Sequence, residues 1–152
     1  MKKISFLLTI IMVLCMFSAC QDRYALISKF IDTAKAVGYV VEDETYEDDE
    51  GLTHLLAFRP ANGATLYHYD FVFTETAEMT QTAFQTLQAE IENHLDSTSS
   101  FLTASGDNYE YYKLTSNGMY TLVSRIDNTL IYTSAPETYK SEIDAFLNEL
   151  GY

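Results

Sequence analysis

A histidine and an aspartate two positions apart are the residues in this sequence best placed to do chemistry. His68 and Asp70 lie in the stretch ATLYHYDFVF, residues 64–73, whose alternating pattern predicts a β-strand. Residues two apart on a strand point to the same face, so the aspartate could orient the histidine as a general base, or both could bind a metal ion. No nucleophile motif such as G-x-S-x-G accompanies them. An exposed polar strand face is therefore the simpler interpretation, with a functional site as the alternative.

The other candidate metal ligands do not follow a known pattern. The remaining two histidines stand at no spacing typical of metal sites. With a two-residue turn at Asn62-Gly63, the simplest hairpin register points the nearer one, His54, away from His68. The acidic run EDETYEDDE, residues 42–50, has seven carboxylates that suit Ca²⁺ but lacks the spacing of an EF-hand loop. We therefore expect no metal site and no cofactor, and interpret the run as a solvated loop. Weak binding of divalent cations and docking of a cationic partner remain open.

Residues 1–19 have the three parts of a secretory signal peptide. Two lysines precede the twelve-residue apolar stretch FLLTIIMVLCMF, after which a serine and an alanine lead to Cys20. The apolar stretch is short for a membrane span, which needs roughly 20 residues. We therefore predict cleavage before Cys20, which leaves a single extracytoplasmic domain of residues 20–152.

The motif Phe17-Ser18-Ala19-Cys20 resembles the lipobox of bacterial lipoproteins, although the first position of that motif is most often leucine. The resemblance implies that the Cys20 thiol carries diacylglycerol through a thioether. The acyl chains would then hold the protein on the extracytoplasmic face of the cell membrane. Because Cys15 lies in the predicted signal peptide, Cys20 is the only cysteine of the predicted mature chain, which argues against a disulfide framework.

The predicted mature chain is strongly acidic. All 22 acidic residues follow residue 19, whereas two of the nine lysines and arginines precede it, so the net charge changes from −13 to −15. Such a chain has no basic surface to exchange for counterions on nucleic acid, so we expect no nucleic-acid partner. It would also be repelled by anionic lipid, which leaves attachment to the acyl chains. The six glycines occur singly, so no phosphate-binding loop is expected.

Hydrophobic periodicity predicts an α+β fold. Apolar residues at three- and four-residue steps indicate helices near residues 22–37, 76–95 and 136–150. Alternating runs on either side of Asn-Gly and Asp-Asn turns indicate antiparallel hairpins between these helices. The predicted order is α-β-β-β-α-β-β-β-α, an antiparallel sheet of about six strands with about three helices on one face.

Two further details of the fold can be tested. A two-residue turn at residues 117–118 would place Glu110 opposite Arg125 on the neighbouring strand. The stretch DSTSSFLTASGDN, residues 96–108, is rich in Ser, Thr and Gly, and we interpret it as an exposed connection.

Tyrosine is abundant, with 12 residues beside nine phenylalanines and no tryptophan. Tyr67 and Tyr69 alternate with His68 and Asp70, so the aromatic face of this strand is expected to pack on a helix. Tyrosine rings are also common on recognition surfaces. We therefore name Tyr67, Tyr69, His68 and Asp70 as candidate binding residues.

Two segments, AVGYVVEDET and SRIDNTLIYTSAPETYKSEIDAFLNELGY, resemble a loose group of small lipoproteins from Firmicutes. The shared motifs are the Gly-Tyr after the first helix, the Asn-Thr hairpin and the closing Leu-Gly-Tyr. These motifs mark a cap, a turn and a terminal helix. The resemblance therefore implies an anchored location but no activity.

Together these features predict a lipid-anchored, non-catalytic module that binds a protein or peptide partner at the cell envelope. Two alternatives stay open: an envelope hydrolase that uses His68 and Asp70, and an acidic inhibitor or immunity-type protein that captures a cationic partner. The hydrolase requires these two side chains to line a cleft beside a third polar group. Capture of a cationic partner requires binding that weakens steeply with salt.

The lipid anchor can be tested by replacing Cys20 with serine. We expect the wild-type chain in the membrane fraction and Cys20→Ser in the soluble extracytoplasmic fraction, because the domain itself has no affinity for anionic lipid. Metabolic labelling with a fatty-acid analogue should mark the wild type alone. A Cys20→Ser protein that stays in the membrane would contradict this prediction.

Overall fold

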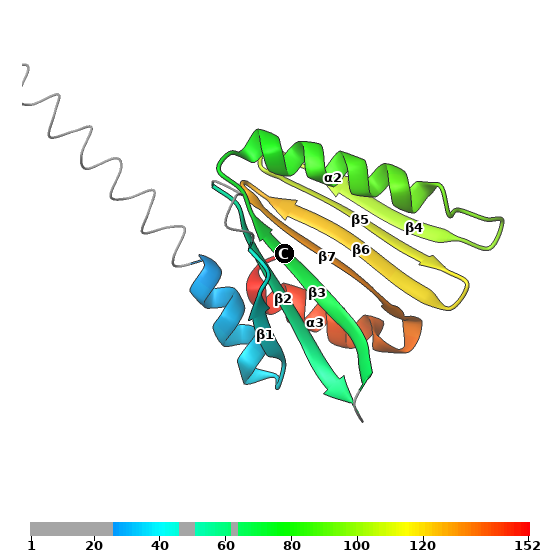
Figure 1. Cartoon of the computed structure of the whole chain (residues 1–152). Coiled ribbons are helices and arrows are strands. Elements are labelled where there is room, and N and C mark those ends of the chain that lie inside the picture. The colour runs from blue at the N-terminus through cyan, green and yellow to red at the C-terminus, as the bar shows by residue number, and fades with distance from the viewer. Residues whose placement is uncertain (1–25, 46–50, 62–63) are drawn as a thin grey trace, which may run out of the picture.

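The computed structural model describes residues 26–45, 51–61 and 64–152, with the backbone alone at 59–61 and 64–66. A seven-stranded sheet in the order β1-β2-β3-β7-β6-β5-β4, antiparallel throughout, forms its middle layer (Figure 1). The predicted signal peptide, Cys20 and part of the acidic run lie outside the described residues. Among the described helices, none is long and apolar enough to cross a bilayer.

The α+β class is confirmed, with seven strands rather than the predicted six. A helix covers residues 26–36. The elements that follow are β1 (Val40–Asp43), β2 (Thr53–Ala61), β3 (Ala64–Phe73), α2 (Ala77–Glu92), β4 (Ser100–Ser105), β5 (Tyr109–Ser116), β6 (Met119–Ile126), β7 (Thr129–Pro136), the 3₁₀ turn η1 (Glu137–Tyr139) and α3 (Lys140–Leu150).

The additional strand, β4, lies in the stretch that we interpreted as an exposed connection. Its six residues, SFLTAS, pair antiparallel with β5 from Ser100 opposite Thr115 to Ser105 opposite Glu110. The serines and threonines suggested a loop, but threonine also favours strands, and backbone pairing with β5 decides the conformation. The stretch is exposed, as predicted, but the prediction that it is a connection was wrong for residues 100–105.

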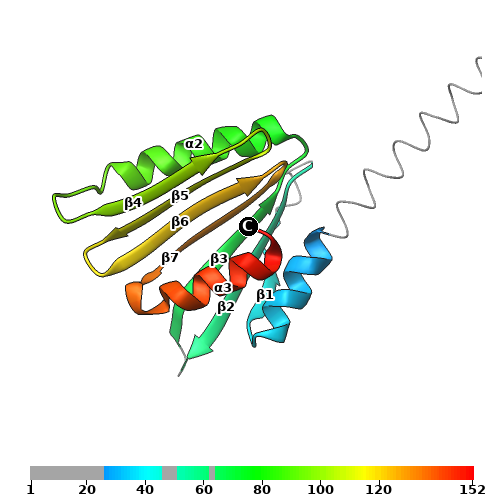
Figure 2. The same ribbon diagram turned by 180° about the vertical axis from the view of Figure 1, so that it is seen from behind.

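Helices cover both faces of the sheet, not one face as predicted (Figure 2). The helix at residues 26–36 and α3 pack on one face, around Phe30 and Phe146. α2 packs on the other face through Phe84, mainly over β6, β7 and β5. The physical reason is that β7 has apolar side chains on both faces of the sheet, such as Leu130 and Ile131. Both are buried, so helices must pack on each face.

The two closing hairpins have the register that the sequence predicts. Asn117 and Gly118 both have positive φ, 52° and 74°, as a type I′ turn requires. Glu110 pairs with Arg125 across β5 and β6, and the Arg125 Nε lies 2.6 Å from the Glu110 Oε2. Because Arg125 is only 6% exposed, this carboxylate neutralises a charge that would otherwise be buried alone.

α2 is tied to the sheet through the hydroxyl of Thr80. This side chain is fully buried, and its hydroxyl lies 2.9 Å from the backbone carbonyl of Asp127 in the β6–β7 turn. Thr82, two residues later, donates its hydroxyl to the Glu78 carbonyl on the exposed side of the helix. The two threonines therefore differ in burial and in what they connect.

Replacing these threonines by valine tests this attachment. Thr80→Val should lower the free energy of unfolding by about 0.5–1.5 kcal/mol, because it removes the hydrogen bond between the buried Thr80 hydroxyl and the Asp127 carbonyl. Thr82→Val should change it by less than about 0.5 kcal/mol. Urea denaturation of the two variants measures both values, and equal effects would contradict this role for Thr80.

Candidate functional site

The structure places a third polar side chain beside His68 and Asp70. The Nε2 of His54 lies 2.9 Å from Oδ1 of Asp70, and the Nε2 of His68 lies 3.3 Å from Oδ2. The carboxylate accepts from the nearer imidazole, so His54 carries its proton on Nε2 in this contact. We call these three residues the His-Asp-His cluster.

A shift in strand register creates this cluster. Ala61 lies opposite Ala64, as expected for the predicted two-residue turn, whose own residues lie outside the described part. Between Phe58 and Pro60 the register then shifts by one residue, so that Phe58 pairs with His68. A one-residue shift moves every later side chain of a strand to the other face. His54 therefore lies on the same face as His68, and the prediction that it points away was wrong.

The cluster lies on an open strand surface. The side chains of His54, Asp70 and His68 are 28%, 23% and 47% exposed. None of them lines either of the two larger cavities on this face of the sheet. In the part of the chain that the structure describes, no three His, Cys, Asp or Glu side chains are arranged to hold a metal ion. The cluster can orient two imidazoles toward solvent.

Tyr67 and Tyr69, the other two candidate binding residues, lie on the opposite face of β3. They are 6% and 0% exposed, and they pack against Tyr39, Tyr139 and Phe146. The hydroxyls of Tyr39 and Tyr67 both donate to Oε1 of Glu142 on α3, at 2.8 and 3.0 Å. These tyrosines therefore hold α3 against the sheet, and the structure does not bring them together with His68 and Asp70.

A groove follows the flank of α2 on the side of the His-Asp-His cluster. It consists of two cavities that meet at Leu87, one of about 650 Å³ beside the first half of the helix and one of about 440 Å³ beside the second half. The first is lined by Leu52, Val72, Thr74, Thr76, Glu78, Met79, Thr82, Ala83, Thr86 and Leu87. The second is lined by Leu87, Glu90, Ile91, His94, Leu114, Ser116, Asn117, Met119, Thr121, Tyr132 and Ser134. We call the two cavities together the α2 groove.

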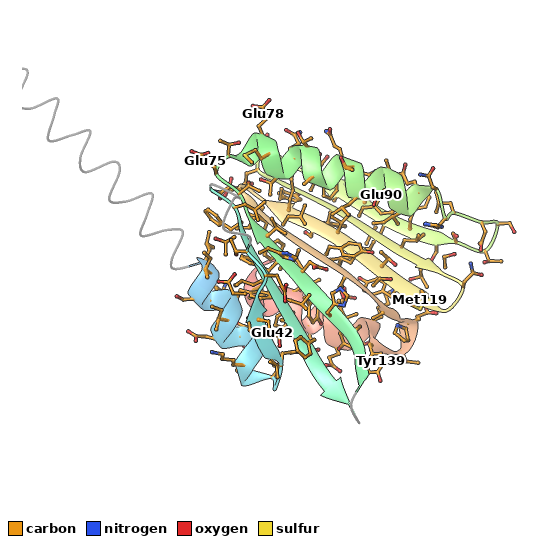
Figure 3. All side chains as sticks on the ribbon, in the orientation of Figure 1. Glu42, Glu75, Glu78, Glu90, Met119 and Tyr139 are labelled. Carbon is orange, nitrogen blue, oxygen red and sulfur yellow. The ribbon has the colours of Figure 1, made fainter. Side chains whose placement is uncertain are left out.

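The groove combines apolar walls with carboxylates. Glu78 and Glu90 stand near the two ends of α2, and Met119 lies at the far end of the groove (Figure 3). Among the residues that the structure describes, no lysine or arginine lines either cavity. Burial first, and then the carboxylates of Asp70 and Glu90, raise the pKa of Tyr132 on the groove floor. Tyr132 therefore lies in the negative field of both the His-Asp-His cluster and the groove.

Most residues of the α2 groove were not among the candidates from the sequence. One signal was present: Met79, Ala83 and Leu87 form a second apolar row, at four-residue steps, beside the buried stripe of α2. An apolar face wider than the contact with the sheet leaves part of that face at the surface. Tyr132 carried no signal of its own, because it enters the site only through its pairing with Asp70.

Comparisons with known proteins identify no family. No protein family and no curated protein matches the sequence. Among solved structures, a GTP-binding regulator from Thermotoga maritima is similar, with 14% identity over 81% of this chain and 82% of the other and a TM-score of 0.46. The extracellular domain of PknH from Mycobacterium tuberculosis is 9% identical over 79% and 69% of the chains, with a TM-score of 0.34. LppA from the same organism, proposed to be a lipoprotein, is 17% identical over 78% and 75%, with a TM-score of 0.29. Similarities this distant assign no activity to the chain.

The buried tyrosines lead to a prediction about high pH. Burial is the main cause that raises the pKa of Tyr39, Tyr67, Tyr69 and Tyr120 far above the usual value of about 10. A group whose pKa is higher in the folded state than in the unfolded state stabilises the fold fully at pH values below its unfolded-state pKa. This contribution to the free energy of unfolding is lost as the pH rises above that pKa. Exposed tyrosines should therefore ionise near pH 10, and the buried ones only when the protein unfolds.

Parallel titrations by near-ultraviolet absorbance and far-ultraviolet circular dichroism measure this behaviour. The second phase of phenolate absorbance should coincide with the loss of secondary structure. A single phase near pH 10 that includes all 12 tyrosines, with the circular dichroism unchanged, would contradict the buried packing of this group.

Proposed function

We propose that this protein is a lipid-anchored, extracytoplasmic binding module that captures a cationic, amphipathic segment of a partner protein or peptide in the α2 groove. The observation that carries the proposal is the combination of apolar walls and carboxylates along the flank of one helix, with no lysine or arginine among the described lining residues. This proposal joins the binding-module hypothesis to the acidic-inhibitor alternative drawn from the sequence.

The charge of the protein favours a cationic partner. The whole chain has a net charge of −13, and Glu78, Glu90 and Asp70 lie in or beside the groove. Carboxylates at the rim of a binding site speed the approach of a cation and select against anionic ligands. The apolar residues Leu52, Met79 and Leu87 would then contact the uncharged side chains of the same segment.

The shape of the groove favours a segment over a small compact ligand. α2 has 16 residues, which corresponds to a length of about 24 Å. The two cavities lie one after the other along it and are open to the surface. An extended or helical peptide can fill both, with apolar anchors in the cavities and basic side chains at Glu78 and Glu90.

The geometry does not favour the hydrolase alternative. That hypothesis required His68 and Asp70 to line a cleft beside a third polar group. His54 supplies the third group, but the three side chains lie on an open strand surface. The His-Asp-His cluster, next to the groove, is better suited to hydrogen bonding with a bound segment.

Binding of a model peptide tests the proposal. The probe is a fluorescein-labelled peptide of lysines and leucines, and the protein is the Cys20→Ser form. We expect saturable binding by fluorescence anisotropy that weakens as salt rises, because the attraction is largely electrostatic. Glu90→Gln should weaken it about two- to fivefold, as expected for the loss of one partly exposed ion pair of up to about 1 kcal/mol.

Two controls separate the groove from the overall charge. Glu137→Gln removes the same charge at an exposed position in η1, outside the residues that line the α2 groove, and should leave the affinity almost unchanged. A peptide of glutamates and leucines should not bind. Equal effects of Glu90→Gln and Glu137→Gln would mean that binding depends on net charge alone, and the groove would then not be the site.

A further inference from the structure

The two edges of the sheet differ in how they are protected. β1, at one edge, is four residues long and includes Glu42 and Asp43. β4, at the other edge, is six residues long and has neither a charged residue nor a proline. Charges and short length are the features that prevent an edge strand from pairing with another chain. β1 has both of them, and β4 has neither.

β4 also exposes large apolar side chains on both faces of the sheet. Phe101 is 61% exposed and Leu102 is 57% exposed, and consecutive residues of a strand point to opposite faces. Phe101 stacks on Tyr112 of β5, with ring centroids 5.8 Å apart, yet most of its surface stays accessible. Neither buried core of the described chain includes a residue of β4. The strand therefore extends past the helices that cover the rest of the sheet.

We infer that the β4 edge is an interface at which two copies of this chain pair antiparallel and join two seven-stranded sheets into one. The row of N–H and C=O groups on the outer side of an edge strand accepts another strand. A second copy offers the same row, so the contact is isologous and closes with two-fold symmetry.

The distribution of charge favours a second copy over a foreign cationic strand. Two copies, each with a net charge of −13, repel each other wherever carboxylates meet. Residues 97–106, STSSFLTASG, contain no charge, so copies can approach along β4 without that cost. A cationic partner would find no carboxylate along this stretch to pair with. The uncharged edge therefore suits a chain with the same composition.

The symmetry of the pair places both α2 grooves on one side. In an antiparallel pair of identical strands, the two-fold axis is perpendicular to the sheet, so each copy presents the same face in the same direction. Phe101 of each copy would then lie on the side of α2, near the centre of the joined sheet. Leu102 would lie on the opposite side, where α3 packs on the sheet of each copy.

Cysteine scanning of β4 in the full-length, membrane-bound protein tests this inference. Single cysteines replace each of the six residues from Ser100 to Ser105 in turn, and membranes are treated with copper phenanthroline. Each step away from the two-fold axis separates a residue from its symmetry mate by a further 6.8 Å or so, about twice the rise per residue. Since a disulfide needs Cα atoms closer than about 7 Å, dimers should form at one or two neighbouring positions and fall to background on both sides.

Matched variants at the two edges provide the control. Phe101→Asp in the best cross-linking background, or Leu102→Asp where the best background is Phe101→Cys, should abolish the dimer, because it opposes like charges close to the axis. Val40→Asp, at an exposed apolar residue of the β1 edge, should leave it unchanged. The parent chain without an added cysteine shows any signal from Cys15 or Cys20.

Two results would overturn the inference. Background cross-linking at all six positions would mean that β4 does not meet its copy. Equal cross-linking at every position, or a dimer that survives the aspartate substitution in β4, would mean collision or a different contact rather than an antiparallel pair.

Discussion

The pairing of β3 with β7 is the constraint on which the rest of the structure depends. It joins the N-terminal strands β1 to β3 with the meander β4 to β7, and the Thr133 hydroxyl donates to the carbonyl of His68, 65 residues away. Without it the chain would form two small sheets, each with an uncovered face. With it, Phe71 meets Ile131 on one face and Val72 meets Leu130 on the other, so two buried cores form on a single sheet.

This pairing also divides the molecule into a face that is closed and a face that is partly open. On the closed face the helix at residues 26–36 and α3 cover the aromatic side chains of β3, and the tyrosine hydroxyls meet Glu142. On the other face α2 covers mainly β5, β6 and β7, which leaves the polar residues of β2 and β3 beside its flank. Asp70 pairs with Tyr132 there, and the His-Asp-His cluster comes to lie next to the α2 groove. β3 thus contributes side chains to the core from one of its faces and to the candidate site from the other.

The α2 groove and the β4 edge differ in charge. Carboxylates accompany the α2 groove and the β1 edge, whereas β4 has exposed apolar side chains and no charge. A strongly acidic surface keeps a protein soluble and directs cations toward it. An uncharged apolar strand at an edge has the opposite effect, because it favours contact with another chain. The two proposed surfaces therefore differ in the kind of partner that each one suits.

The sequence by itself determined the α+β class, the presence of α2 and α3 and the register of the closing hairpins, because each depends on local periodicity or a two-residue turn. Three features were decided only by the tertiary structure. The register shift near Pro60 brought His54 to Asp70, the pairing of β4 with β5 made a strand of a Ser- and Thr-rich stretch, and the packing of α2 placed a groove beside Tyr132. Each depends on contacts between residues far apart in the chain or on a bulge. Pro60 favours a bulge, but neither a single proline nor propensity specifies the register that follows.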